Sequence, residues 1–91
     1  MNWEALYRQM IAYLEQQIRF NLHMMREYDH SWEISRNASY LESRNRYYQQ
    51  LRALRDVYMA VGFQMPKEVR DKVVSLKLLQ EMVDLTPATI S

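Results

Sequence analysis

Residues 1–61 are MNWEALYRQMIAYLEQQIRFNLHMMREYDHSWEISRNASYLESRNRYYQQLRALRDVYMAV, and they contain neither glycine nor proline. The only glycine of the 91-residue chain is Gly62, and the two prolines are Pro66 and Pro87. Glycine and proline most often interrupt regular structure, so a stretch of this length without them favours long helices. The same stretch carries apolar residues at helical spacing. We therefore predict an all-α chain built on a long antiparallel helical hairpin.

The first helix is expected from about residue 3 to about residue 33. Apolar residues recur there every three or four positions, with one gap of seven, which is the spacing of one helix face. They are Trp3, Tyr7, Met10, Leu14, Ile18, Leu22, Met25 and Trp32. Leu6, Tyr13 and Met24 widen this face. The serine and asparagine residues of 35–39 predict a break, with Ser39 and Glu42 as a capping box for the next helix. One continuous rod to residue 61 remains the alternative.

The second helix is expected over about residues 40–61, and the third over about residues 66–84. Gly62 stands where a left-handed residue would end the second helix, and Pro66 suits the first turn of the third. The connections are short, which favours antiparallel packing.

These helices predict a single helical domain over residues 1–85. After it, residues 86–91 are expected to form a flexible C-terminal tail.

The composition limits the classes of function. At 48% hydrophobic and 25% charged residues, the chain is typical of globular proteins. The absence of cysteine removes disulfides, thiolate catalysis and cysteine-based zinc sites, and it fits a reducing cytosol. No run approaches the roughly 20 apolar residues that span a bilayer. We expect a cytoplasmic protein that does not contact membranes.

Nothing in the sequence predicts catalysis. Phosphate-binding loops need several glycines for close backbone approach, and this chain has one. Without cysteine, a nucleophile would have to be Ser, Thr or Lys, and none is paired with a base. We predict a non-enzymatic protein without a cofactor.

A weak candidate for a metal site is formed by His23, Glu27 and His30. Glu and His three residues apart share a helix face, as in carboxylate-bridged di-iron bundles. A complete site needs a second copy of this motif, which only a symmetric dimer would supply. The alternative is a set of solvated polar residues, and we expect no bound metal.

The second helix contains the basic part of the chain. Residues 36–55 hold five arginines and one acid, although the net charge of the chain is only +1. The arginines are Arg36, Arg44, Arg46, Arg52 and Arg55. Together with the tyrosines between them, they predict a second possible function, the binding of nucleic acid or an anionic ligand. The alternative is that they pair with acids of the first helix.

The leading prediction is protein binding through self-association. The chain has seven Met, seven Tyr and two Trp, which are residue types enriched at protein interfaces. The first helix outruns the second, so its N-terminal turns need cover from the 63–65 corner or from another chain. The exposed interface is expected at Trp3, Leu6, Tyr7 and Met10. We predict a homodimer or higher oligomer that acts as an adaptor, regulator or inhibitor of another protein.

Arg44 is the remaining interface candidate. It occupies one position of the apolar seam of the second helix, where a charged residue can set register or partner choice. Its partner would be a carboxylate of the first helix or of a second subunit. The alternative is that the side chain reaches along the helix to water.

Overall fold

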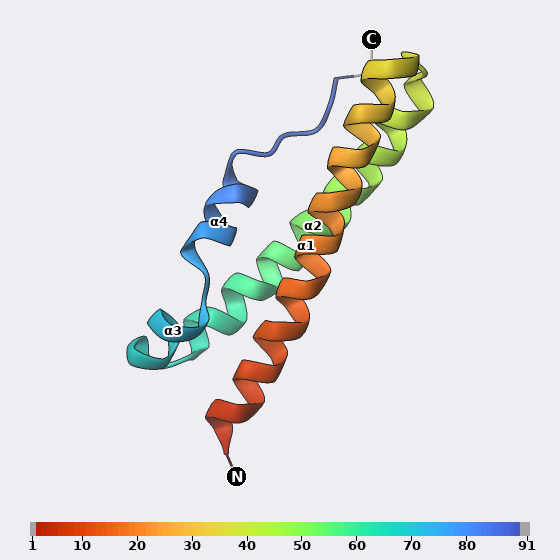
Figure 1. Ribbon diagram of the computed structural model, residues 1–91. Coiled ribbons are helices and arrows are strands. Elements are labelled where there is room, and N and C mark those ends of the chain that lie inside the picture. The colour runs from red at the N-terminus through yellow and green to blue at the C-terminus, as the bar shows by residue number, and fades with distance from the viewer. Residues whose placement is uncertain (1, 90–91) are drawn as a thin grey trace.

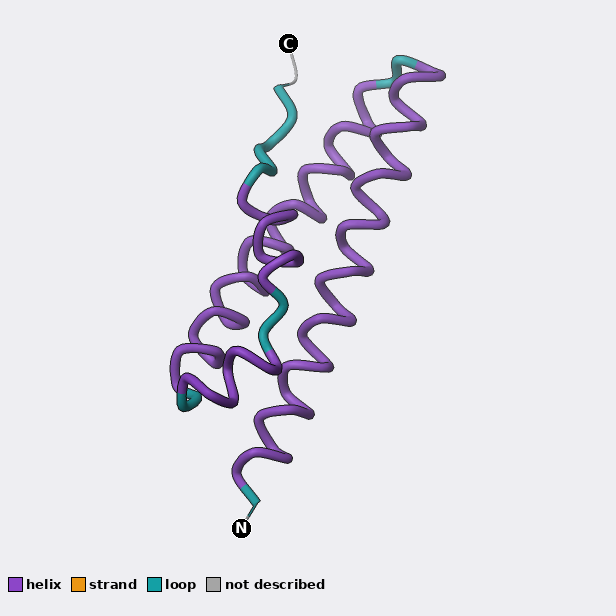
Figure 2. Tube along the Cα trace, turned by 60° about the vertical axis from the view of Figure 1, so that its left-hand side comes forward, coloured by secondary structure: helices purple, strands orange, loops and turns teal. Residues whose placement is uncertain are grey.

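The protein forms an elongated helical structure with principal extents of 51 × 19 × 17 Å. The computed structural model describes residues 2–89, and this range contains helices and no strand. The helices are α1 (Trp3–Ser35), α2 (Ala38–Gln64), α3 (Lys67–Val73) and α4 (Leu76–Val83). α1 and α2 form an antiparallel hairpin, and α3 and α4 return along one side of it (Figure 1, Figure 2).

The all-α fold and the hairpin are confirmed, and the single rod is wrong. Both ranges predicted for the domain and the tail, 1–85 and 86–91, reach beyond the part of the chain that is described. Met1, at the start of the first range, and residues 90–91, at the end of the second, lie outside the described residues.

The turn between α1 and α2 lies where the sequence predicts a break. Arg36 adopts the left-handed conformation with φ of 57°, and its N–H donates to Trp32 O at 2.8 Å. The predicted capping residue Ser39 is wrong, because Asn37 is the N-cap and its Oδ1 accepts the Ser39 N–H at 3.0 Å. Asparagine is among the strongest N-cap residues, so α2 begins two residues earlier than expected.

α2 continues through Gly62, which corrects the predicted end of this helix. Gly62 has no positive φ, and the helix runs on to Gln64. The helix stops because Pro66 disfavours the helical conformation at the preceding residue, and Met65 is extended with φ −81° and ψ 148°. The glycine instead allows close packing, since a Cβ at this position would lie 3.1 Å from Val74 Cγ2.

The single third helix predicted over residues 66–84 is also wrong, because the chain bends between α3 and α4. Val74 is extended with φ −80° and ψ 127°, and Ser75 caps α4 by accepting the Leu78 N–H at 3.2 Å. The Tyr58 hydroxyl accepts the Ser75 N–H at 2.8 Å, and this contact satisfies a donor that a continuous helix would have bonded internally.

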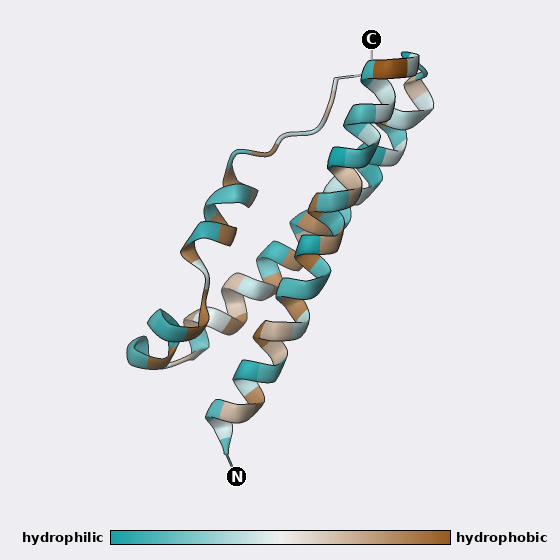
Figure 3. Ribbon diagram, viewed as in Figure 1, coloured by the Kyte–Doolittle hydropathy of each residue, from teal (hydrophilic) through white to brown (hydrophobic). Residues whose placement is uncertain are grey.

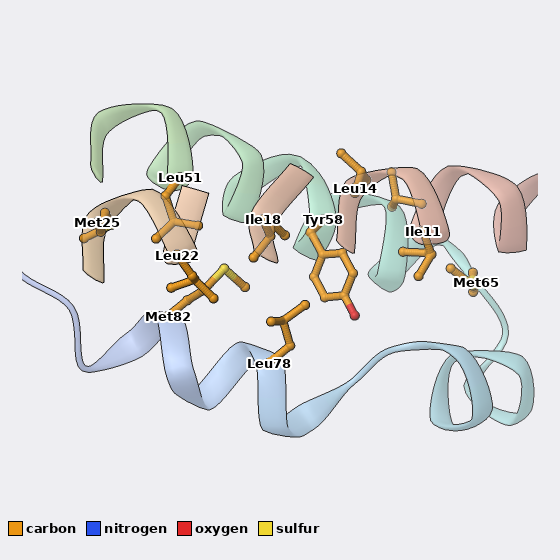
Figure 4. Packing of buried hydrophobic residues seen from close by; sticks show 11 residues of the cluster. Ile11, Leu14, Ile18, Leu22, Met25, Leu51, Tyr58, Met65, Leu78 and Met82 are labelled. Atoms are coloured by element: carbon orange, nitrogen blue, oxygen red, sulfur yellow. The ribbon is translucent and has the colours of Figure 1, made fainter. Parts of the chain in front are cut away.

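The core lies between the hairpin and α4. Figure 4 shows Leu78 and Met82 of α4 pointing towards Tyr58 and Leu22 of the hairpin. Tyr58 is completely buried, and Leu78 and Met82 are each 1% exposed. Each such side chain contributes roughly 1.5–3 kcal/mol when it leaves water. α4 therefore covers one face of the hairpin and leaves the opposite face open.

Candidate protein-binding surface

The N-terminal end of α1 is only partly covered by the 63–65 corner. Met65 is buried, and Tyr7 packs half-buried against the core. Phe63 is 68% exposed. The other three predicted interface residues, Trp3, Leu6 and Met10, remain exposed. The overhang expected from the sequence is therefore present, and it retains a large apolar surface.

These exposed residues begin a longer apolar stripe on α1. Trp3 is 60% exposed, Tyr13 is 61% exposed and Phe20 is 51% exposed, so the stripe is separate from the buried one. Its positions alternate by three and four residues, which is the spacing of a seam that packs against another helix. We define the outer stripe of α1 as Trp3, Leu6, Met10, Tyr13, Gln17, Phe20 and Met24.

α2 carries a matching stripe of smaller residues. Its positions also alternate by three and four, and all of them are exposed. We define the outer stripe of α2 as Gln50, Ala53, Val57, Ala60 and Gln64. Neither outer stripe contains a charged residue. A solvated helix face normally carries charges, so two uncharged stripes are unusual for surfaces that remain in water.

Both stripes lie on the face of the hairpin opposite α4. Successive residues turn by about 100° around a helix. On α1, the buried residues separate the outer stripe from Leu22, which lies beside Met82 (Figure 4). On α2, the buried residues separate the outer stripe from Arg44, which bonds the segment after α4. We call the two outer stripes together the back face.

Large and small residues lie side by side on the back face. Tyr13 and Ala60 are the same number of residues from the 36–37 turn, and so are Phe20 and Ala53. In an antiparallel hairpin, such residues lie about level with one another. The back face is therefore raised along α1, where the side chains are large, and low along α2.

A pocket of about 260 Å³ lies where α2, α3 and α4 meet. Its lining is mostly apolar and consists of Tyr58, Met59, Gly62, Phe63, Arg70, Asp71, Val74, Leu76 and Leu79. Phe63 stands at the pocket with the Arg70 guanidinium 5.8 Å from its ring centre. This pocket enlarges the exposed apolar area at the end of the hairpin that also carries Trp3.

Arg44 is buried within the chain rather than presented on the surface. Its Nε lies 3.2 Å from Asp29 Oδ1 on α1, and its Nη1 donates to Thr86 O at 2.6 Å. The guanidinium also lies 6.0 Å from the ring centre of Tyr48. The sequence predicted a carboxylate of the first helix or of a second subunit beside Arg44, and within the chain the structure places Asp29 of the first helix there.

The other four candidate arginines do not form one patch. Arg36 lies at the turn over the Trp32 ring, at 5.3 Å. Arg46 and Arg52 are six residues apart and so point about 120° away from each other around α2. Arg55 has Asp56 as a neighbour at 3.6 Å. Arg46 lines a pocket of about 170 Å³ with Tyr28, Ser43, Tyr47 and Gln50.

The weak metal candidate is not assembled within residues 2–89. His23, Glu27 and His30 are all exposed on α1. In this range no three His, Asp or Glu side chains come together in a group that would hold a metal ion.

No family model, curated protein or solved structure matches this chain. The surfaces of the chain are therefore the evidence for its function. No helix in the described part of the chain combines the length and apolar character needed to cross a membrane. Figure 3 shows apolar residues recurring along α1 among hydrophilic ones, rather than in one continuous run.

Sequence reasoning placed Tyr13 and Met24 at the edge of the buried stripe of α1. It missed that they continue the heptad spacing of Trp3, Leu6 and Met10 on a separate face. The spacing itself could have revealed this, since the positions alternate by three and four over six intervals. The outer stripe of α2 was not predicted, because alanine and glutamine do not mark a helix face as large apolar residues do.

Proposed function

We propose that this chain is a non-enzymatic protein-binding module that acts as a homodimer, with the back face as the subunit interface. One observation carries the proposal: large apolar side chains on α1 repeat at seam spacing, without charge, while remaining exposed to water. Exposed apolar surface of this extent marks interaction sites in soluble proteins.

The shape of the back face favours a second copy as the occupant. A two-fold axis parallel to the long axis of the hairpin, between two facing back faces, would set the large residues of one α1 on the small residues of the partner's α2. Tyr13 and Phe20 would enter the spaces left by Ala60 and Ala53. Alternation of large and small residues is what allows facing helices to interdigitate. The product is a four-helix bundle built from two hairpins.

The area available reaches the lower end of the range for specific dimers. Twenty-one residue steps from Trp3 to Met24 span about 32 Å, and two adjacent helices are roughly 20 Å wide. The resulting footprint of about 600 Å² approaches the ~800 Å² per partner that specific interfaces bury. Because neither outer stripe carries a charge, pairing two identical faces brings no like charges together.

The experiment is the mass in solution, measured by light scattering after size exclusion. The wild-type chain of 11.1 kDa is expected at twice this mass, at both low and high salt. Tyr13→Glu is expected to give the monomer with unchanged helix content, because a carboxylate would have to be desolvated in the interface. Ala12→Glu is the matched control, since it adds the same charge to an exposed position outside the stripe. A wild-type monomer at 100 µM concentration would contradict the proposal.

A second candidate function is the binding of an anionic ligand at the Arg46 pocket. The pocket combines a guanidinium, a hydroxyl and an amide with two tyrosines whose rings stack at 5.8 Å. Arginine and aromatic rings together suit a phosphate next to a planar base. A fluorescent single-stranded oligonucleotide is expected to bind weakly, to lose affinity as salt rises, and to lose it in Arg46→Ala but not in Arg52→Ala. Equal loss in the two variants would indicate non-specific attraction instead.

A further inference from the structure

The segment after α4 is held through its backbone. It runs without helix alongside α2 towards the hairpin turn (Figure 1). Arg44 Nη1 donates to Thr86 O at 2.6 Å, and Asn45 Nδ2 donates to Ala88 O at 2.9 Å. The Ala88 N–H donates to Asn45 Oδ1 at 2.8 Å. Two neighbouring side chains of α2 therefore contact main-chain atoms at two positions that flank Pro87.

The two side chains are oriented by the hairpin itself. Arg44 is fixed by Asp29 and by the Tyr48 ring, as described above. Its Nη1 also lies 3.3 Å from Asn45 Oδ1, which sets the direction of the asparagine amide. With Oδ1 turned towards donors, Nδ2 is left to bond a carbonyl. The site thus presents an acceptor and a donor that match the N–H and the C=O of the same residue.

Leu85 packs against the core, and after it the side chains of the segment make few contacts. Thr86, Pro87 and Thr89 are exposed, and Ala88 is half-buried. Proline at the central position restricts φ and lacks an N–H, so no donor is left unpaired there. Contacts that bond main-chain groups and leave side chains free are typical of sites that accept extended peptides.

We propose that Arg44 and Asn45 form a binding site for an extended, proline-containing segment of another protein, and that the chain's own C-terminal segment occupies it as a tethered competitor. The fitting partner presents a carbonyl, then proline, then a small residue that offers both its N–H and its C=O. A short tether gives the chain's own segment an effective concentration on the order of millimolar, so an external segment must exceed this to replace it. The site lies opposite the back face and does not depend on dimer formation.

The test follows the Ala88 amide of the full-length ¹⁵N-labelled chain by NMR while unlabelled peptide DLTPAT, the sequence of residues 84–89, is added. We expect the amide to move from its docked position to its free position, with half the change on the order of millimolar peptide. In Asn45→Ala, the amide is expected at its free position without peptide and does not respond. Gln49→Ala, an exposed change one turn further along α2, is the control and is expected to behave as wild type.

Three outcomes would overturn the proposal in different ways. A free Ala88 amide in the wild-type chain would show that the segment is not docked. If ten millimolar peptide does not move the docked amide, the segment is a fixed part of the fold and the site does not exchange peptides. A peptide with glycine in place of proline is expected to compete several-fold more weakly, because it loses more entropy on binding. Equal competition would remove the preference for proline.

Discussion

The Tyr58 hydroxyl donates to Glu15 Oε1 at 2.7 Å, and this contact joins the C-terminal half of α2 to α1. The same oxygen accepts the Ser75 N–H at 2.8 Å, at the bend between α3 and α4. One fully buried side chain therefore connects the hairpin with the helices that cover it.

Tyr58→Phe is expected to destabilise the chain by about 1–3 kcal/mol, because the Ser75 N–H and the Glu15 carboxylate lose a buried partner. For a chain of this size, that loss lowers Tm by roughly 4–8 °C for each kcal/mol. Thermal unfolding followed by circular dichroism measures it. Tyr40→Phe, at a half-buried position of α2 outside the back face, removes a tyrosine hydroxyl and is expected to leave Tm unchanged. An equal loss in the two variants would contradict the role given to Tyr58.

The stability contributed by Tyr58 is expected to depend on alkaline pH. Burial, reinforced by the Glu15 contact and opposed by the Ser75 N–H, raises the pKa of Tyr58 to about 12. In the unfolded chain the pKa of tyrosine is ~10, so the folded state holds the Tyr58 hydroxyl proton more tightly. The contribution is therefore complete below pH ~10 and is lost as pH rises towards 12.

Denaturant unfolding of wild type and Tyr58→Phe at pH 8 and pH 11 isolates this effect, because the other titrating groups are common to both. The advantage of wild type should shrink by about 1 kcal/mol at the higher pH. A constant difference would mean that Tyr58 titrates normally in the folded state.

A glycine-to-alanine change separates helix propensity from packing at Gly62. Alanine favours a helix interior by about 1 kcal/mol over glycine, but its Cβ would lie 3.1 Å from Val74 Cγ2. We expect Gly62→Ala to change stability little in wild type and to stabilise the Val74→Ala variant. A double-mutant cycle in urea should give a coupling of at least about 0.5 kcal/mol. Additive changes would show that the two residues do not press on each other.

Asn21 is a polar residue inside the core. Its Nδ2 donates to Gln17 O at 2.7 Å, whereas its Oδ1 has no hydrogen-bond partner among the described residues. An unsatisfied buried acceptor costs about 1–3 kcal/mol, so Asn21→Leu, which has a similar volume, is expected to raise the free energy of unfolding. Asn21→Ala is expected to lower it by opening a cavity. A destabilised leucine variant would indicate that water satisfies the amide.

Trp3 offers a direct optical test of the back face. In a Trp32→Phe background, Trp3 is the only tryptophan and is exposed in the single chain. Dimer formation would bury its ring, so its emission should shift to shorter wavelength as protein concentration rises. In the same background, Tyr13→Glu should abolish the shift. An unchanged spectrum from 1 to 100 µM would place Trp3 outside any interface.

The hairpin could be predicted because its causes are local. Apolar spacing and the absence of glycine and proline fix α1 and α2, and Asn37 lies within the predicted break. The bend at Ser75 could not be predicted in this way, since it depends on the Tyr58 hydroxyl, 17 residues earlier in the sequence. The role of Gly62 was predicted wrongly for the same reason, because the residue that it packs closely against, Val74, comes 12 residues later in the sequence.

The candidate sites differ in the same way: local sequence patterns predict one of them, and contacts between distant residues form the other. Exposure of Trp3, Leu6 and Met10 was expected from the unequal helix lengths. The structure adds a second cause, because these residues lie on an outer face that stays exposed as far as Phe20. The Asn45–Ala88 contacts join residues 43 positions apart and leave no periodic pattern to detect.

The placement of α4 on one face of the hairpin has a consequence for assembly size. If both faces of the hairpin were uncovered, each subunit could bind another subunit on either side, and the assembly would grow into a filament. Here Leu78 and Met82 already fill one face, so in the proposed dimer each subunit would pair through the other face alone. Association by this route would stop at two chains, because the eight residues of α4 cover the face that a third chain would need.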